Sequence, residues 1–273
     1  MSSWINGRAS TAIDHRDRGL QYGDGVFETM RVGQGRIRLL DYHLERLYEG
    51  CRRLNIRAPN AGKLERELVM HAASRADAVL KLIVTRGIGP RGYILSGQER
   101  CTRVISLHAL PRSVARAALE PKRLRMCRTQ LGINPALAGL KTLNRLESVV
   151  ARAEWRDARV WDGLMRDVEG NVISGTMSNF FIKRGPFLLT PMLDRCGVAG
   201  VMRRWVLEQA GTLGLRPLEG RLRWEEFGEA DEAFVTNAVA GIVPIAVIQQ
   251  GSDRVAFRHT ETSARLHARL ELL

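Results

Sequence analysis

Lysine is the residue type on which the chemistry of this sequence is expected to depend. The chain carries 42 lysines and arginines, but only five of these are lysine: Lys63, Lys81, Lys122, Lys141 and Lys183. Arginine stays protonated in proteins, whereas a lysine amine can form a Schiff base once desolvation or a neighbouring cation lowers its pKa. If the protein performs imine chemistry, these positions are the candidates.

Two of these lysines lie in apolar surroundings. Lys141 begins the run Lys-Thr-Leu-Asn-Arg-Leu-Glu, and residues 141–158 are predicted to form an amphipathic helix. The predicted apolar stripe of this helix consists of Leu143, Leu146, Val150 and Ala153. Lys81 lies in the apolar strand predicted for residues 79–84, where its amine is either buried or extends to solvent. Lys141 is therefore the first candidate nucleophile, and Lys81 is its rival.

The composition is that of a soluble globular protein. The 273 residues are 45% hydrophobic and 26% charged, which suffices for one large or two ordinary domains. The chain starts without an apolar leader, so a cytoplasmic protein is expected. The six histidines form no HExxH or HxH pair, so no metal site is expected. The cysteines lack CxxC spacing and are predicted to be reduced thiols: Cys51, Cys101, Cys127 and Cys196.

The net charge of +13 allows three interpretations. A nucleic-acid-binding protein would need clustered basic residues and aromatic platforms, but the arginines are spread along the chain and aromatic residues make up 6%. An arginine-rich solvated surface explains the charge without any function. The positive field could also attract a small anionic substrate or cofactor.

Strands and helices alternate along the chain, and many connections are predicted hairpins. Residues 26–32 and 36–40 are predicted to form one such hairpin, with Asp41 as the N-cap of the helix that follows. The apolar stripe of that helix is Leu44, Leu47, Cys51 and Leu54. The predicted fold class is mixed α+β in two domains, residues 1–113 and 114–273, rather than a doubly wound sheet.

Two glycine-rich segments could bind ligands. Residues 87–92 match GxGxxG, but a proline interrupts the turn and extended chain follows, so dinucleotide binding is not expected. This segment is either a substrate loop that carries Arg91 and Tyr93 or a structural turn. The loop 197–200 precedes the helix predicted for residues 201–213, and free N–H groups at a helix start can bind phosphate. Many helices begin after glycine without binding anything.

Several segments together resemble one family, the fold-type IV pyridoxal-phosphate enzymes. This family includes branched-chain and D-amino-acid aminotransferases and 4-amino-4-deoxychorismate lyases. The similar segments follow in the same order along nearly the whole chain: Asp17–Thr29, His43–Leu47, Lys141, Gly200–Arg203, Asn237–Ala238 and Pro244. The resemblance implies a two-domain fold with pyridoxal 5'-phosphate between the domains. It also implies a homodimer and a small anionic substrate, with no nucleic-acid or membrane partner.

The resemblance also assigns roles to individual residues. Lys141 matches the lysine that forms the Schiff base. The cofactor-binding positions that it implies are Arg46, Ser174, Val201, Met202, Asn237 and Ala238. The substrate-binding positions that it implies are Phe27, Arg91, Tyr93, Asn144 and Arg145.

Within this family, the run 141–147 is most similar to the lyases. Branched-chain aminotransferases place a tyrosine where this chain has Leu146. Most members also place a glutamate against the pyridine nitrogen, whereas the matching residue here is Ser174. A hydroxyl cannot keep that nitrogen protonated as an anion would, so we expect a weaker electron sink unless Glu169 or another residue replaces the missing charge.

A weak sink favours elimination over transamination. Expulsion of enolpyruvate makes an aromatic ring, which drives the step, whereas transamination needs stabilised charge on the cofactor. The resemblance therefore implies a lyase that converts 4-amino-4-deoxychorismate into 4-aminobenzoate and pyruvate for folate synthesis. The alternative is an aminotransferase that acts on D- or branched-chain amino acids.

Overall fold

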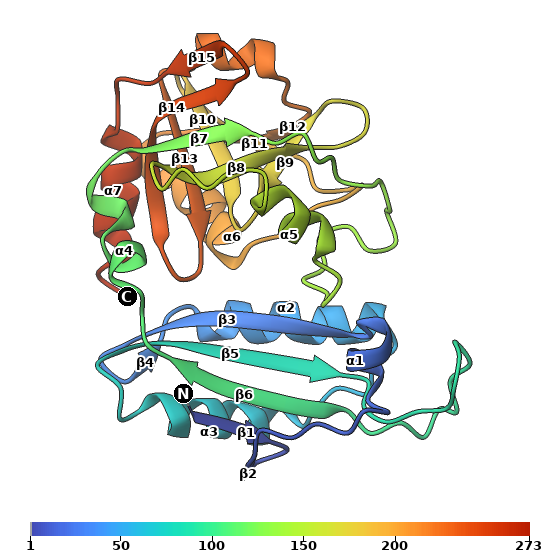
Figure 1. The fold of residues 1–273 in the computed structure, drawn as a ribbon. Coiled ribbons are helices and arrows are strands. Elements are labelled where there is room, and N and C mark those ends of the chain that lie inside the picture. The colour runs from blue at the N-terminus through green and yellow to red at the C-terminus, as the bar shows by residue number, and fades with distance from the viewer. Residues whose placement is uncertain (1) are drawn as a thin grey trace. The chain divides into compact units, whose positions relative to one another are not determined.

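The computed structural model describes residues 2–273, except the side chains of Ala115 and Leu119. Its internal contacts divide the chain into two compact units (Figure 1). Unit 1 contains the residues up to Pro111 together with Leu140–Asn144, and unit 2 contains Arg112–Gly139 and Arg145–Leu273. The short segment Leu140–Asn144 thus belongs to a different unit from the residues on either side of it.

Unit 1 contains an antiparallel sheet with the strand order β2-β1-β6-β5-β3-β4. The elements of this unit are β1 (Ser2–Ile5), β2 (Arg8–Ala9), α1 (Arg18–Tyr22), β3 (Gly25–Gly33), β4 (Arg36–Ile37), α2 (Leu40–Arg53), α3 (Ala61–Ala72), β5 (Asp77–Thr85) and β6 (Thr102–His108). The antiparallel pairing of β3 with β4 confirms the predicted hairpin.

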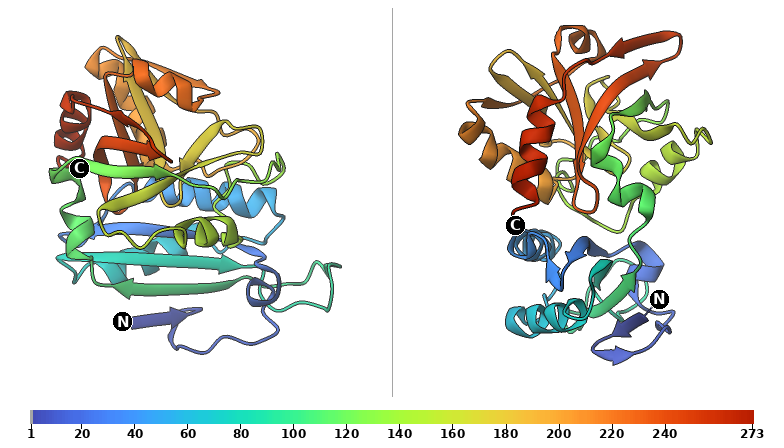
Figure 2. Two further views of the ribbon diagram at one scale, coloured as in Figure 1. Left: turned by 45° about the horizontal axis from the view of Figure 1, so that its top comes forward. Right: turned by 90° about the vertical axis from the view of Figure 1, so that its left-hand side faces the viewer.

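Helices α2 and α3 both cover one face of this sheet (Figure 2). Strand residues of alternating position, such as Val26, Met30 and Leu82, pack there against helix residues such as Leu47 and Leu68. Side chains alternate between the two faces of a strand, so the intervening residues of β3 and β5 lie on the opposite face. The predicted apolar stripe of α2 is confirmed, because its residues belong to this core or pack against it.

Helix α2 begins two residues earlier than predicted. Asp41 does not cap the helix; Leu39 is the N-cap residue, with a left-handed φ of 53° and no side-chain hydrogen bond. Asp41 lies in the first turn, where its negative charge interacts favourably with the positive end of the helix dipole.

Unit 2 contains a sheet with the strand order β12-β11-β10-β13-β14-β7-β8-β9, and β15 pairs with β14. The sheet curls, because β9 at one end of this order also contacts β10 and β11. The elements are α4 (Arg112–Ala115), η1 (Ala117–Leu119), β7 (Lys122–Met126), α5 (Leu146–Arg152), β8 (Val160–Arg166), β9 (Val172–Gly175), β10 (Asn179–Arg184), β11 (Phe187–Pro191), α6 (Val201–Ala210), η2 (Gly211–Leu213), β12 (Arg216–Gly220), η3 (Trp224–Glu229), β13 (Glu232–Asn237), β14 (Gly241–Gln250), β15 (Asp253–Ala256) and α7 (Glu261–Leu270).

The helix predicted for residues 141–158 forms only over a shorter part of that range. Helix α5 begins only at Leu146 and ends at Arg152. Residues 141–143 are instead extended, and their backbone pairs with β3. The predicted apolar stripe does not face a core within the described structure, since Leu146 is 78% exposed and Val150 is 57% exposed. Backbone pairing to a strand outweighed a helical pattern in the side chains.

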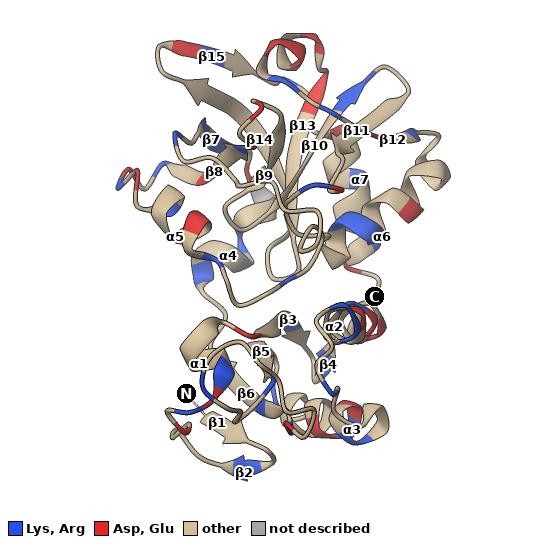
Figure 3. Ribbon diagram, turned by 90° about the vertical axis from the view of Figure 1, so that its right-hand side faces the viewer, with Lys and Arg blue, Asp and Glu red and all other residues tan. Residues whose placement is uncertain are grey.

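Charged residues are dispersed over both units. Figure 3 shows lysine and arginine on many elements, with acidic residues among them. This distribution fits the solvated-surface interpretation of the net charge better than a single nucleic-acid-binding face. None of the helices in residues 2–273 has the length and apolar composition needed to span a bilayer.

Candidate active site

Lys141 is held at the edge of the unit 1 sheet by its own backbone. Phe27 N donates to Lys141 O at 3.0 Å, and Leu143 N donates to Gly25 O at 3.0 Å. Thr142, between them, forms a bridge with Val26 and is buried. Paired residues share a face, so Lys141 projects to the face that carries Phe27. Its Nζ lies 4.2 Å from the centre of the Phe27 ring.

A second lysine contacts the same ring. Lys81 Nζ lies 5.3 Å from the centre of the Phe27 ring. Two lysines elsewhere pair with acidic residues, Lys122 with Glu120 and Lys183 with Asp231. Lys141 and Lys81, the two candidate nucleophiles from the sequence, therefore contact the same aromatic side chain of unit 1.

A buried ionic cluster lies on the helix-covered face of β3. Glu28 accepts hydrogen bonds from Arg46 Nε at 2.8 Å and Arg46 Nη2 at 2.5 Å, and His43 Nδ1 lies 2.5 Å from Glu28 Oε2. Burial opposes ionisation of Glu28, but the charge of Arg46 and the hydrogen bonds from His43 and Arg46 hold its pKa at about 2. Burial lowers the pKa of His43, whose Nδ1 is the ring nitrogen that contacts Glu28. Arg46 is therefore anchored to Glu28.

The turn before β3 contacts the segment after Lys141. Asn144 Nδ2 donates to Gly23 O at 3.2 Å, and Gly23 has a left-handed φ of 66°. A Cβ on Gly23 would lie 2.3 Å from Asn144 Oδ1, so glycine is required for this approach. The amide of Asn144 thus fastens the lysine segment to unit 1, while Arg145 already belongs to unit 2. The substrate-binding roles of Asn144 and Arg145 stay predictions.

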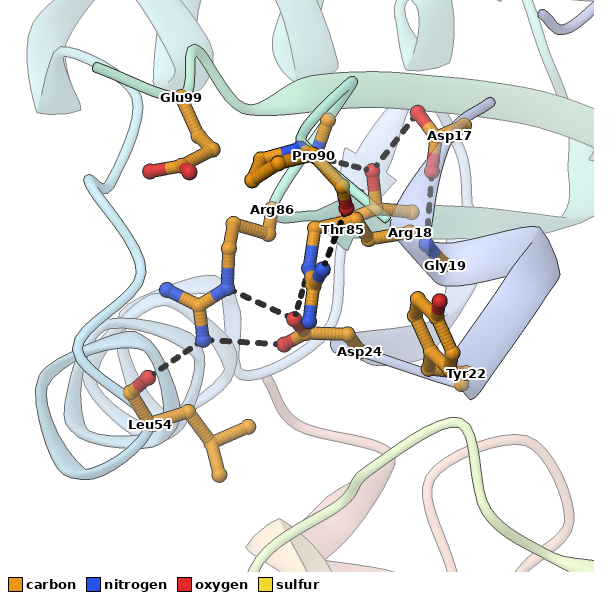
Figure 4. A network of polar contacts seen from close by, with 12 residues as sticks. Asp17, Arg18, Gly19, Tyr22, Asp24, Leu54, Thr85, Arg86, Pro90 and Glu99 are labelled. Atoms are coloured by element: carbon orange, nitrogen blue, oxygen red, sulfur yellow. Dashed lines mark hydrogen bonds and ion pairs between the residues drawn. The ribbon is translucent and has the colours of Figure 1, made fainter. Parts of the chain in front are cut away.

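The loop between β5 and β6 carries Arg91 and Tyr93, and both side chains are exposed. Figure 4 shows the polar network at its base, where Arg18 Nη1 donates to Pro90 O at 3.2 Å. The same atom donates to Gly92 O at 2.8 Å. These hydrogen bonds fix the base of the loop. The side chain of Tyr93, by contrast, is 87% exposed.

Asp24 links the two arginines of this network (Figure 4). It accepts from Arg18 Nε at 3.0 Å and from Arg86 Nε at 2.7 Å. Arg86 also donates to the Leu54 carbonyl at 2.8 Å, which ties the end of α2 to the start of the loop. The glycine motif of residues 87–92 is followed by irregular chain and not by a helix, in agreement with the prediction.

The start of helix α6 in unit 2 has the features of an anion-binding turn. Gly200 is the N-cap residue and provides no side-chain hydrogen bond, so N–H groups of the first turn lack a side-chain acceptor. A Cβ on Gly200 would lie 2.0 Å from Asn179 Oδ1, so the position has no room for a side chain. Asn179 Nδ2 in turn donates to Val198 O at 2.9 Å and supports the loop. The predicted glycine loop and helix start are confirmed.

A second turn in unit 2 follows β13. Asn237 Oδ1 accepts from Val239 N at 3.0 Å and from Ala240 N at 2.7 Å, so this side chain shapes the turn. Ala238 lies between these residues. The buried hydroxyl of Thr236 has no hydrogen-bond partner among the described residues. The Asn237 side chain is thus engaged within the turn itself.

Ser174 is buried in β9, opposite Met165 of β8. Glu169, one alternative source of negative charge, forms a two-bond ion pair with Arg195 at 2.5 and 2.6 Å. Its side chain is 48% exposed, so it belongs to a surface pair. Glu169 is thus engaged away from the buried strand that carries Ser174.

A buried carboxylate that no sequence pattern indicated lies beside this strand. Asp162 accepts hydrogen bonds from Gly163 N at 2.8 Å, Thr176 Oγ1 at 2.6 Å and Ser178 Oγ at 2.7 Å. Burial raises its pKa above the ordinary value. A Cβ on Gly175 would lie 2.2 Å from Asp162 Oδ2. An Asp-Gly pair is typical of a turn, so the sequence did not indicate that the Asp162 carboxylate is buried.

Comparisons with known proteins agree with this arrangement. The sequence model of the amino-transferase class IV family matches residues 25–248. A crystal structure of 4-amino-4-deoxychorismate lyase from Pseudomonas aeruginosa has a TM-score of 0.92 and 42% identity, and the alignment covers 98% of each chain. Aminodeoxychorismate lyase from Vibrio harveyi is 32% identical over 98% of each chain. A putative branched-chain-amino-acid aminotransferase from Methanocaldococcus jannaschii is 30% identical over 90% of this chain and 87% of that protein.

Proposed function

This chain belongs to the amino-transferase class IV family, and on that premise we propose that it is a pyridoxal-phosphate-dependent 4-amino-4-deoxychorismate lyase. The products are 4-aminobenzoate and pyruvate. The observation that carries this proposal is Lys141, whose backbone is fixed on both sides and whose amine lies against Phe27. Identities of 42% and 32% to two lyases over nearly the full chain support the lyase over the aminotransferase.

Each unit, taken by itself, carries groups that suit pyridoxal phosphate. The aldehyde of this cofactor needs an amine, and its phosphate needs N–H donors without side-chain acceptors. Lys141 supplies the first, and the first turn of α6, with the close approach at Gly200, supplies the second. We assign the phosphate to Arg46 and to the backbone N–H groups of Val201, Met202 and Ala238. The Ser174 hydroxyl is assigned to the pyridine nitrogen.

The chain's own contribution to the reaction is proton transfer by Lys141. Pyridoxal phosphate, when bound, supplies an electron sink conjugated with the substrate nitrogen. The Lys141 amine takes the proton from the ring carbon that bears this nitrogen. The electrons of that C–H bond form the aromatic ring as the C–O bond to enolpyruvate breaks. Lys141 then returns the proton to enolpyruvate, which leaves as pyruvate.

Ser174 helps to decide between elimination and transamination. Its hydroxyl is neutral, and Glu169, which could have restored a charge, is paired with Arg195. A weak sink slows transamination, which needs charge held on the cofactor, more than an elimination that is driven by aromatisation. The residue thus supports the lyase over the aminotransferase.

We also propose that the protein acts as a cytoplasmic homodimer. The four cysteines are free thiols, which suits a reducing compartment. Helix α5 exposes Leu146, Val149 and Val150, and clustered apolar side chains of this kind favour a protein contact. Sedimentation velocity tests the dimer: a monomer across the micromolar range would contradict it.

The function is tested by offering the loaded protein two substrates in parallel. With 4-amino-4-deoxychorismate, equal amounts of 4-aminobenzoate and pyruvate are expected. With D-alanine and 2-oxoglutarate, little amino transfer is expected. Rapid transfer from D-alanine without any 4-aminobenzoate would instead identify an aminotransferase.

A further inference from the structure

We propose that Arg18 is a positioning residue that fixes the backbone around Arg91 in the loop between β5 and β6. This inference rests on the proposed lyase function, in which Arg91 binds the anionic substrate. Both residues belong to unit 1. The side chain of Arg18, in α1, is only 4% exposed, whereas Arg91 is exposed on the loop. The two arginines are connected through the main chain of the loop.

Helix α1 holds the peptide groups on both sides of Arg91. On one side, Arg18 Nη1 donates to the Pro90 carbonyl at 3.2 Å (Figure 4). On the other side, Gly92 N donates to the Tyr22 hydroxyl at 3.0 Å, and Arg18 Nη1 also donates to Gly92 O at 2.8 Å. The guanidinium of Arg18 lies 4.7 Å from the centre of the Tyr22 ring. Neither peptide next to Arg91 can rotate without losing a hydrogen bond to this helix.

The charges of the buried network explain why Arg18 binds the loop. Asp24 accepts from Arg18 Nε at 3.0 Å and from Arg86 Nε at 2.7 Å, so two guanidinium groups share one carboxylate (Figure 4). A buried guanidinium is unfavourable unless its other N–H groups also find acceptors. Arg86 finds them at the carbonyls of Leu54 and Asn55. Arg18 finds them in the loop, so its burial depends on the loop staying in place.

The loop also fits closely around the side chain of Arg18. A Cβ at Gly89 would lie 2.7 Å from Arg18 Cδ and 3.3 Å from Glu99 Cγ. Glu99, near the other end of the loop, accepts from Ser96 N at 2.6 Å and from Ser96 Oγ at 2.8 Å. Arg91 is therefore presented from an ordered backbone before any substrate binds. A substrate that meets a preorganised arginine does not have to order the loop, which favours binding.

Kinetics of Arg18→Met test the inference, with Arg16→Met as the matched control. Arg16 forms an exposed ion pair with Asp14, two residues before Arg18. Arg18→Met leaves Asp24 paired with Arg86, so no buried charge is left without a partner. Its KM for 4-amino-4-deoxychorismate should rise about 10-fold, because the substrate must then order the loop. Its kcat and pyridoxal-phosphate absorbance should match those of the wild type and of Arg16→Met.

Two further variants separate positioning from a general effect on the fold. In Arg18→Lys, a compact ammonium replaces the planar fork, so only part of the affinity should return. In an Arg91→Ala background, Arg18→Met should raise the KM far less than in the wild type, because the side chain that it positions is missing. Equal effects in both backgrounds, or a collapse of kcat at constant KM, would overturn the inference.

Limited digestion with trypsin provides a readout that is independent of turnover. Cleavage after Arg91 requires the loop to leave its ordered position. The cofactor-loaded Arg18→Met should be cut there about 10-fold faster than the wild type, and Arg16→Met should be cut at the wild-type rate. An unchanged rate in Arg18→Met would overturn the inference. If the wild type releases no 4-aminobenzoate, the proposed function has failed, and the digestion still decides whether Arg18 holds the loop.

Discussion

The backbone amide of Phe27 donates to the carbonyl of Lys141, and the Phe27 ring contacts the amine of the same lysine at 4.2 Å. One residue therefore fixes both the main chain and the reactive end of Lys141. This explains how a short segment with little secondary structure of its own can hold the amine of Lys141 in one position. The geometry depends on the close approach of residues 141–143 to β3.

Gly25→Ala should disturb this approach. A Cβ at Gly25 would lie 2.6 Å from Val84 O and 2.9 Å from Leu143 Cδ1, so the lysine segment must move outward. Misplacement of a catalytic group by about 1 Å costs about 100-fold in rate, so kcat should fall by that order. Gly33→Ala in the same strand has no atom within 4 Å of the new Cβ and serves as the control. Equal kcat values for the two variants would contradict the role given to this contact.

Glu28→Gln should make the protein less stable near neutral pH. The pKa of Glu28 falls from 4.5 to about 2 on folding, so its ionised form favours the folded state by roughly 3 kcal/mol. This stabilisation is complete above pH 4.5 and is lost as the pH falls toward about 2. The wild type and the variant should therefore differ in unfolding free energy at neutral pH and converge in acid.

Urea unfolding over this pH range measures the difference. Glu49→Gln is the control, because Glu49 forms an exposed ion pair with Arg52 on the same helix. A wild type and Glu28→Gln that differ by a constant amount at every pH would show that the ionisation of Glu28 is not the source of the effect.

Gly200→Ala should weaken cofactor binding. The new Cβ would clash with Asn179 Oδ1 at 2.0 Å and shift the first turn of α6 away from the phosphate. Loss of one hydrogen bond to a charged group corresponds to about a 10-fold or greater rise in the Kd for pyridoxal phosphate. Gly211→Ala, just after the helix, has free space and should leave the Kd unchanged. Fluorescence titration of the apoprotein with the cofactor distinguishes these results.

Ser174→Glu should increase side transamination. A carboxylate at this position would hold the pyridine nitrogen protonated and strengthen the electron sink. The ratio of amino transfer from D-alanine to 4-aminobenzoate release should rise, whereas Ser174→Ala should not raise it. An unchanged ratio in Ser174→Glu would show that the sink does not control the choice of reaction.

The sequence was most informative where a pattern is local. The apolar stripe of α2, the hairpin of β3 and β4, and the glycine loop before α6 were all predicted, because each depends on residues close together in the chain. The chemical importance of Lys141 came from residue type and from resemblance. These signals do not require knowledge of the tertiary structure.

The errors arose where distant segments meet. Residues 141–143 were predicted as the start of an amphipathic helix, but backbone pairing with β3 makes them extended. The ionic cluster of Glu28 with His43 and Arg46 joins a strand to a helix, and no spacing rule connects the three. Asp162 gains its hydrogen bonds from residues more than ten positions away, such as Thr176 and Ser178. Nothing near Asp162 in sequence distinguishes it from a solvated aspartate.

The proposed function depends on proton transfer by Lys141 in the elimination. The most direct test is the release of 4-aminobenzoate and pyruvate from 4-amino-4-deoxychorismate by the wild type and by Lys141→Ala, each supplied with pyridoxal phosphate. We expect equal release of both products by the wild type and none above background by Lys141→Ala. Substantial release by Lys141→Ala would contradict it, and would move the catalytic amine to Lys81.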